Sequence, residues 1–206
     1  MVSTVAFFCL EYNNSLAGMT LWEKWVQSLF NSLVPRSAGF ASVNPATFLD
    51  VTMLLIVTQM IIGGSSQSMA GGIKVNTLGV AFASLRAVLL GHQGATAFNR
   101  TISRASVRRA NAIVTLSLLT LLAYCVAMLL LEPALPPKAV VFETVSALFT
   151  VGSSLGITAD LGDVAKTLLC TAMFLGRVGL LSLLCGMMRQ RRDLSPHLPS
   201  DNVIIN

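Results

Sequence analysis

Long apolar runs separated by short polar stretches dominate the hydropathy pattern of this chain. An uncharged run extends from Ala110 to Leu131, and a second run from Thr167 to Met188 contains a single charge, Arg177. Each run is long enough to cross a hydrocarbon core of about 30 Å as a helix. The pattern therefore predicts an all-α integral membrane protein, and buried helices of a large soluble protein are the alternative.

Composition favours the membrane interpretation. The chain is 54% hydrophobic and 11% charged, whereas soluble domains carry about 25% charged residues. So few polar side chains cannot cover long apolar helices in water. The stretch 2–10 is apolar but too short to span and lacks a basic n-region, so we interpret it as the outer end of a longer helix and not as a signal peptide. The cysteines lie in apolar runs without CxxC spacing and are expected to be packing residues: Cys9, Cys125, Cys170 and Cys185.

Basic residues are distributed unevenly. Five arginines and no acids lie in the stretch 86–109, and the tail 189–206 begins with three more arginines. Positively charged loops stay in the cytoplasm, so the linker 91–109 and the tail are expected there. The segments 11–50 and 132–163 would then face outward. Nucleic-acid binding is not expected, because topology already accounts for the charge of this short linker.

The two outward segments resemble each other. Residues 30–50 read FNSLVPRSAGFASVNPATFLD, and residues 142–163 read FETVSALFTVGSSLGITADLGD. Alignment of Gly39 with Gly152 also aligns the aspartates that end the segments. Each has an amphipathic stretch, a small-residue turn with glycine, an extended polar stretch and a long apolar run. This order predicts a helix, a re-entrant half-helix, an extended return and a second helix.

The predicted half-helices, 22–34 and 139–149, suit cation binding. A half-helix whose C-terminal end points into the membrane directs negative potential there. The extended segment that follows can present carbonyls, which replace the hydration shell of the ion in potassium filters. Glycine fits because it adopts the backbone dihedrals that turn carbonyls inward. Two ordinary external loops with turn glycines are the alternative.

Four stretches together resemble the Trk/Ktr/HKT superfamily of potassium transporters. They are PRSAGF (35–40), IGGSSQSMAGGIKV (62–75), ALFTVGSSLGIT (147–158) and MFLGRVGLLSLL (173–184). The GRVG element and the short basic tail resemble the Ktr-type pore-forming subunit in particular. The resemblance implies a potassium-channel-like transporter built from helix–pore loop–helix repeats. Residues 1–90 would hold most of the third repeat, and residues 110–188 would hold all of the fourth.

The resemblance also implies a selectivity filter. Backbone carbonyls of two strands would coordinate dehydrated potassium, namely those of Ser37, Ala38, Gly39, Phe40, Thr150, Val151, Gly152 and Ser153. The family usually keeps only the central glycine of each filter strand, so the side chains beside the glycines say little about whether these strands form a filter.

A broken helix is predicted between the two glycine segments. Residues 46–90 are too many for one span of about 20 residues, and a two-span hairpin would put the glycine segments on opposite faces. We expect half-helices over 46–62 and 73–90 and a loop beside a cavity between them. The loop matches the intramembrane gate of the resembled family: Gly63, Gly64, Ser65, Ser66, Gln67, Ser68, Gly71, Gly72 and Lys74. A passive kink or a loop outside the membrane is the alternative.

The two basic residues near this loop have open roles. A nucleotide P-loop is excluded at Lys74, because the GxxxxGK[ST] pattern is missing. Lys74 would either anchor the lower half-helix or repel cations at the gate. A charge at the depth of Arg177 usually pairs or faces water, and the residue lies too deep to snorkel. In the resembled family the GRVG arginine lies near the pore, so we hypothesise that Arg177 meets carbonyls of the loop 63–72 and stabilises the closed state.

Two of four filter strands cannot enclose an ion, so the chain alone is not expected to conduct. It would be a fragment of a longer reading frame, one half of a split transporter, or a chain that dimerises; the truncated first helix favours the fragment. The resemblance implies a homodimer of pore chains on a cytosolic ring of nucleotide-binding regulatory subunits, which the basic faces 100–109 and 189–192 would meet.

The predicted function is uptake of potassium or another monovalent cation across the plasma membrane. No cofactor is expected, and sodium is an alternative ion. No HxxxH, CxxC or Ser–His pair supports an enzyme. A non-conducting fragment or a membrane scaffold remains the alternative function.

Overall fold

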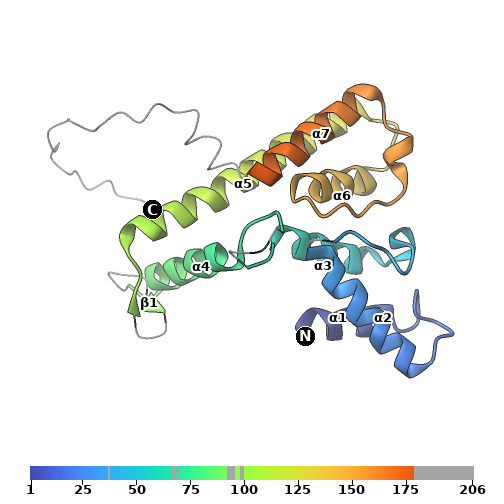
Figure 1. Cartoon of the computed structure of the whole chain (residues 1–206), viewed down its shortest axis with the longest axis horizontal. Coiled ribbons are helices and arrows are strands. Elements are labelled where there is room, and N and C mark those ends of the chain that lie inside the picture. The colour runs from blue at the N-terminus through green and yellow to red at the C-terminus, as the bar shows by residue number, and fades with distance from the viewer. Residues whose placement is uncertain (37, 66–67, 69, 92–95, 98–99, 179–206) are drawn as a thin grey trace, which may run out of the picture.

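The computed structural model describes residues 1–36, 38–65, 68, 70–91, 96–97 and 100–178 (Figure 1). The helices are α1 (Val2–Glu11), α2 (Leu21–Leu33), α3 (Asp50–Ile61), α4 (Val75–Leu89), α5 (Arg104–Leu131), α6 (Pro137–Leu148) and α7 (Asp163–Val178). Short 3₁₀ turns cover η1 (Val34–Arg36), η2 (Pro45–Thr47) and η3 (Ile157–Ala159). Two antiparallel strands of two residues each, β1 (Thr96–Ala97) and β2 (Arg100–Thr101), lie in the linker. The predicted helical fold class is confirmed.

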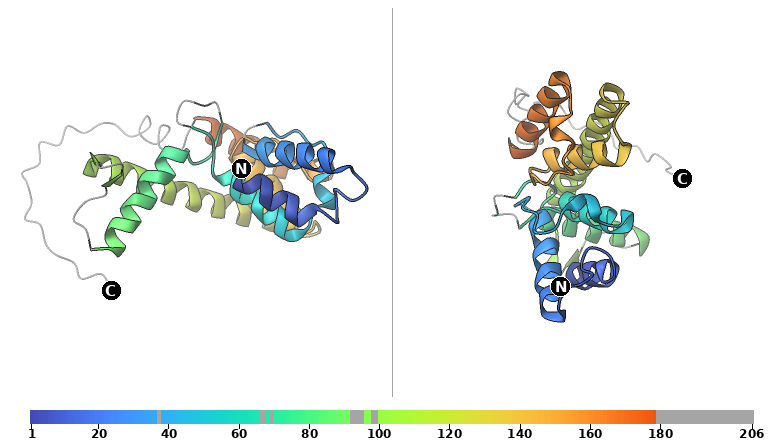
Figure 2. Two further views of the ribbon diagram at one scale, coloured as in Figure 1. Left: turned by 90° about the horizontal axis from the view of Figure 1, so that it is seen from below. Right: turned by 90° about the vertical axis from the view of Figure 1, so that its right-hand side faces the viewer.

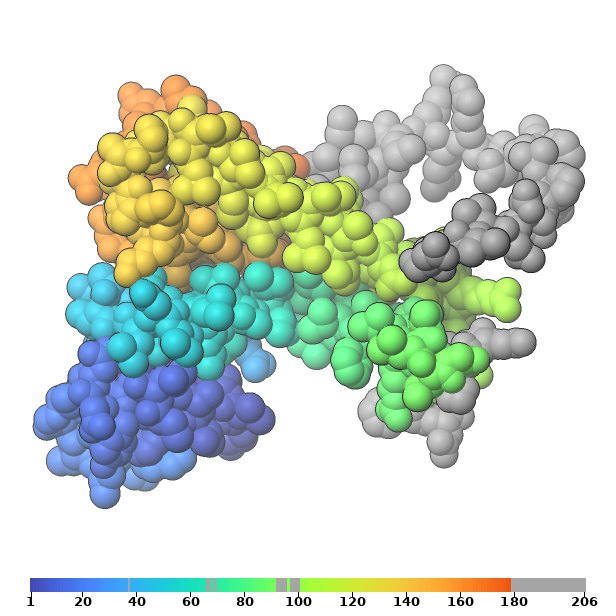
Figure 3. Space-filling view, turned by 180° about the vertical axis from the view of Figure 1, so that it is seen from behind, coloured from blue at the N-terminus to red at the C-terminus, as the bar shows by residue number. Residues whose placement is uncertain are grey.

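The helices form two successive units of similar design. In each, a helix packs against a short half-helix, and a further helix follows after an extended return: α1, α2 and α3 in the first unit, and α5, α6 and α7 in the second. The half-helices α2 and α6 occupy the two amphipathic stretches of the sequence. Figures 1 and 3 show α1 and α2 at one end of the molecule, α3 in the middle, and α5 to α7 beyond it.

The helix that follows the first glycine segment is interrupted. The chain leaves α3 at Ile61 and enters α4 at Val75, so the break coincides with the Gly/Ser stretch. α4 packs along the N-terminal half of α5, and the two extend together away from the other helices (Figures 1 and 2).

Local signals in the sequence fix where several helices begin. Thr20 and Glu23 form a reciprocal capping box at the start of α2. The hydrogen bonds from the Thr20 backbone N–H and hydroxyl group lower the pKa of the exposed Glu23 carboxyl. At α5, the Ser103 hydroxyl accepts a hydrogen bond from the Ser106 N–H. The helix therefore begins at Arg104, inside the basic linker and before the predicted start of the span at Ala110.

The α5 helix carries the clearest membrane signal. Among the described residues it is the helix long and apolar enough to cross a membrane, with a mean hydropathy of 2.4 over its most apolar window. Only 6% of that window is buried within the chain, so most of its apolar side chains face the surroundings. Of the second predicted span, 167–188, α7 covers the part up to Val178, and the remainder lies outside the described residues.

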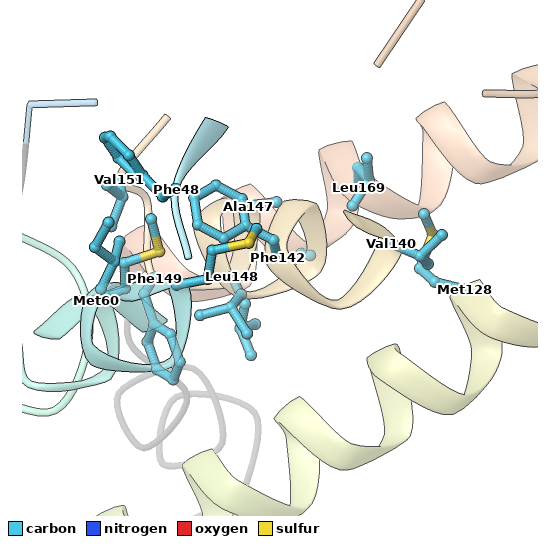
Figure 4. Packing of buried hydrophobic residues seen from close by; sticks show 14 of the residues in the cluster. Phe48, Met60, Met128, Val140, Phe142, Ala147, Leu148, Phe149, Val151 and Leu169 are labelled. Carbon is cyan, nitrogen blue, oxygen red and sulfur yellow. The ribbon is translucent and has the colours of Figure 1, made fainter. Parts of the chain in front are cut away.

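The hydrophobic core is centred on α6. Its residues Val140 and Phe142 are 0% and 2% exposed. Phe48 and Met60 join this core from the first unit, and Met128 joins it from α5 (Figure 4). The second half-helix is therefore held on several sides by the rest of the chain.

The first half-helix, α2, is much less covered. Its buried residues are polar, whereas Trp22 is 77% exposed and Leu33 is 52% exposed. An apolar surface of this kind marks contact with lipid or with further protein. The two half-helices thus occupy different environments, although their sequences follow the same plan.

Candidate functional site

The two glycine segments meet in space, although they are far apart in the sequence. Gly39 and Gly152 both have left-handed backbones, with φ of +67° and +86°. A Cβ built on Gly39 would lie 2.6 Å from the carbonyl carbon of Gly152 and 2.9 Å from its oxygen. The backbones therefore touch at the two positions where the sequence predicts filter strands. Glycine is required at Gly39 by both its dihedral and the contact.

The backbone after α6 turns its amide groups back toward the helix. The N–H groups of Thr150 and Val151 donate to the carbonyls of Ala147 and Ser146, at 3.1 and 2.9 Å. A trans peptide holds its N–H and C=O in opposite directions, so the Thr150 carbonyl points away from α6. Thr150 itself has a φ of +53°, which is strained for a β-branched residue.

The first glycine segment has the same arrangement. The N–H groups of Ala38 and Gly39 both donate to the Val34 carbonyl, at 3.0 and 3.4 Å. By the same peptide geometry, the Ala38 carbonyl points away from Val34. Ser37 lies outside the described residues. Of the remaining predicted filter residues, Val151 and Ser153 are buried and Phe40 is exposed.

The loop between α3 and α4 is closed at its neck by backbone pairing. Ile62 and Ile73 form a parallel bridge, and the Gly63 N–H donates to the Ile73 carbonyl at 3.0 Å. The Val75 N–H donates to the Gly64 carbonyl at 3.2 Å. The described members of the predicted gate loop are Gly63, Gly64, Ser65, Ser68, Gly71, Gly72 and Lys74, while Ser66 and Gln67 lie outside the described residues.

The loop lies directly against the end of α6. A Cβ built on Gly71 would lie 2.8 Å from the Phe149 carbonyl carbon and would overlap the Thr150 hydroxyl. The side chain of Lys74 reaches back into the loop, and its Nζ donates to the carbonyls of Ser68, at 3.0 Å, and Ala70. Lys74 therefore ties the loop together, and Gly71 places the loop where the second predicted filter strand begins.

A cavity of about 310 Å³ connects these elements. Its wall includes loop residues, the end of α6 and the last turn of α7: Ala70, Gly71, Gly72, Lys74, Leu148, Phe149, Gly176 and Arg177 among others. A Cβ on Gly176 would lie 2.8 Å from the Leu148 carbonyl carbon, so α7 packs closely on the end of α6. The structure thus brings Arg177 and the loop into one cavity.

Polar side chains of the half-helices hold the extended returns, and the sequence analysis missed this role. In the second unit, the buried Glu143 accepts hydrogen bonds from Ser154, Leu155 and Thr158. In the first unit, Asn31 donates to Ser42 at 3.0 Å. The signal in the sequence was a polar residue directly after the phenylalanine that begins each aligned segment.

Comparisons with known proteins agree with this arrangement. Residues 1–192 match the sequence profile of a family described as "TrkH: Cation transport protein". The chain is 34% identical over 206 residues to the Ktr system potassium uptake protein B of Vibrio alginolyticus, covering 99% of this chain and 45% of that protein. It is 31% identical over 205 residues to the Ktr system potassium uptake protein D of Bacillus subtilis, again covering 45% of the relative.

A solved structure shares the fold. The chain superposes on the crystal structure of the potassium transporter TrkH from Vibrio parahaemolyticus with a TM-score of 0.76 at 18% identity. The match covers 91% of this chain and 42% of that one. The chain therefore spans about half the length of the relatives that it matches.

Proposed function

Because the chain belongs to the TrkH family of cation transport proteins, we propose that it forms half of a potassium-conducting pore. The family consists of membrane transporters, so the chain is a membrane protein. The Ktr relatives are named as potassium uptake proteins, which supports potassium as the ion. Since the chain spans 45% of these relatives, two further filter strands would come from outside it.

The contact between Gly39 and Gly152 carries this proposal. Two left-handed glycines meet backbone to backbone at the ends of two half-helices. The amide groups beside them are bonded back to the half-helices, which leaves the opposite carbonyls of Ala38 and Thr150 directed away. Carbonyls that converge on a cation replace the water around it, and these two would contribute to such a set. The proposed strands are residues 37–40 and 150–153.

The loop 63–72 would gate this pore from below. It packs on Phe149 and Thr150 at the lower end of the second strand. Lys74 and Arg177 add two positive charges to the cavity wall beneath, where they would oppose the passage of a cation in the closed state. Contact of Arg177 with the loop carbonyls would favour that state.

The same proposal includes the surroundings of the pore. Residues 1–90 and 110–188 would be the third and fourth repeats in a plasma membrane, with 91–109 and 189–206 in the cytoplasm, following the distribution of arginines. The first two repeats would come from the preceding part of a longer chain or from a separate chain. Pore chains would pair and rest on a cytosolic nucleotide-binding ring.

Rubidium uptake in cells without their own potassium uptake systems tests the proposal. The chain is expressed alone and beside a polypeptide that supplies two further repeats, and its amount in the membrane is measured. Uptake is expected only with the partner, and Gly152→Ser should lower it strongly. Gly18→Ser is the matched control, because Gly18 has a similar φ of +84° and open space around it but lies outside the filter.

Two results would contradict the proposal. Absence of uptake with the partner, with both polypeptides in the membrane, would favour a non-conducting scaffold. An equal loss in Gly152→Ser and Gly18→Ser would mean that backbone strain alone, and no filter role, explains the effect.

A further inference from the structure

A buried carboxylate lies on the half-helix that precedes the second proposed filter strand. Glu143 lies on the central half-helix α6, and the residue is 6% exposed. Three donors converge on one of its oxygens, Oε1: the Ser154 hydroxyl, the Leu155 N–H at 3.3 Å and the Thr158 hydroxyl at 3.1 Å. These donors belong to the return segment that follows Gly152.

The donors also lie close to one another. The Ser154 and Thr158 hydroxyls are 3.0 Å apart, and the Gly156 N–H donates to the Ser154 oxygen at 2.9 Å. Gly156 has a φ of +89°, which makes the turn that brings Thr158 back toward α6. The segment from Ser154 to Thr158 therefore wraps around the Glu143 carboxylate and is fixed to the same half-helix that ends at the filter.

In the first unit, neutral side chains connect the half-helix to its return segment. Asn31 donates to the Ser42 hydroxyl at 3.0 Å, and that hydroxyl donates to Gln27. With Gly39 aligned on Gly152, Asn31 matches Thr144 and Glu143 matches Phe30, so the two braces lie one position apart on their half-helices. A brace near this position thus recurs without a charge.

We propose that Glu143 is a positioning residue for ion selection: it holds the return segment so that the filter strand around Gly152 keeps its carbonyl geometry. This inference rests on the proposed pore function. Because the three hydrogen bonds share one oxygen and the first unit uses amides, hydrogen bonding and not negative charge carries the role. A glutamine at position 143 has one carbonyl oxygen and can accept the same three bonds.

The test compares three variants in the two-polypeptide uptake system. We measure the apparent KM for rubidium, the maximal rate and the ratio of rubidium to sodium uptake. Glu143→Ala should raise KM by about tenfold and lower the ratio, because the three donors lose their shared acceptor and the return segment rearranges to find other partners. Glu143→Gln should keep KM and the uptake ratio within about twofold of the values for the unmodified chain, because the amide oxygen accepts the same hydrogen bonds. Asp160→Asn, an exposed acid on the same return segment, should change nothing.

The outcomes separate the inference from the proposed function. The inference would be overturned if Glu143→Ala changed only the maximal rate, in proportion to the protein in the membrane. It would also be overturned if Glu143→Gln were as impaired as Glu143→Ala. No uptake by the unmodified pair would refute the pore function itself. If Glu143→Ala does not reach the membrane, the double variant Ser154→Ala/Thr158→Val removes two of the three donors and must raise KM.

Discussion

The glycines of the two proposed filter strands, Gly39 and Gly152, should differ in their tolerance of a single added methyl group. Replacement of either by alanine places a Cβ on a left-handed backbone, which costs about 1–3 kcal/mol. At Gly39 the Cβ would also lie 2.6 Å from the Gly152 carbonyl carbon, whereas ordinary contacts begin at 3.4 Å. Because the Val151 carbonyl oxygen lies nearer still, one strand must move by at least about 0.8 Å, the difference between these distances. At Gly152 the Cβ meets no atom within 4 Å.

We therefore expect Gly39→Ala to abolish rubidium uptake and Gly152→Ala to retain part of it. Gly18→Ala controls for backbone strain alone, since its φ is +84° and its Cβ also meets no atom. Uptake is measured in the two-polypeptide system and divided by the amount of protein in the membrane. If Gly152→Ala is as damaging as Gly39→Ala, the direct contact between the strands does not limit uptake and the reasoning is wrong.

Three further predictions concern the cavity below the proposed filter. Gly176→Ala should abolish uptake in protein that still reaches the membrane, because its Cβ would force α7 away from Leu148; uptake at the unmodified level would contradict the close packing. Lys74→Met should raise basal uptake by about tenfold or more, because it removes two charged hydrogen bonds worth about 1.5–3 kcal/mol each from the loop; Lys74→Arg is the charge-retaining control. Arg177→Gln should also raise basal flux, and an unchanged flux would refute a closed-state role.

The broken helix could be predicted because a length argument constrained it. Residues 46–90 exceed one span, and the Gly/Ser stretch marks the break that the structure has between Ile61 and Val75. The start of α5 at Arg104 was not foreseen, because the positive-inside rule says where arginines lie and not whether they are helical. The Ser103 cap supplies the missing reason.

The site was predictable in its residue types but not in its contacts. Glycines in matching segments indicated filter strands, yet their backbone contact depends on how two distant segments meet, which hydropathy does not encode. Glu143 lies in the segment 132–163, which the distribution of arginines placed outside, and nothing in the sequence indicated that its side chain is buried. Its burial follows from the position of α6 at the centre of the core, which depends on tertiary packing and not on the local sequence. The exposed apolar face of α2 has the same origin, since neighbours and not periodicity decide which face is covered.

The internal repeat, weak in sequence identity, is strengthened by a pair of equivalent contacts away from the filter. In the first unit, Glu11 at the end of α1 accepts a hydrogen bond from the Leu49 N–H at 3.0 Å. In the second, Glu132 at the end of α5 accepts one from the Gly162 N–H at 2.7 Å. Both donors immediately precede the aspartate that begins the third helix of their unit.

These glutamates each tie the first helix of a unit to the start of its third, across the half-helix and its return. The return segment is thereby closed at both ends, by the half-helix on one side and by the glutamate on the other. Connections of this kind fix the path of an extended backbone that has no strand partner, because its direction is set by where it begins and ends. The contact recurs in both units despite different spacing along the chain, so the two returns end in the same way. A pore built from such units would need that constraint, since the carbonyls proposed to meet the ion belong to the least regular backbone in the fold.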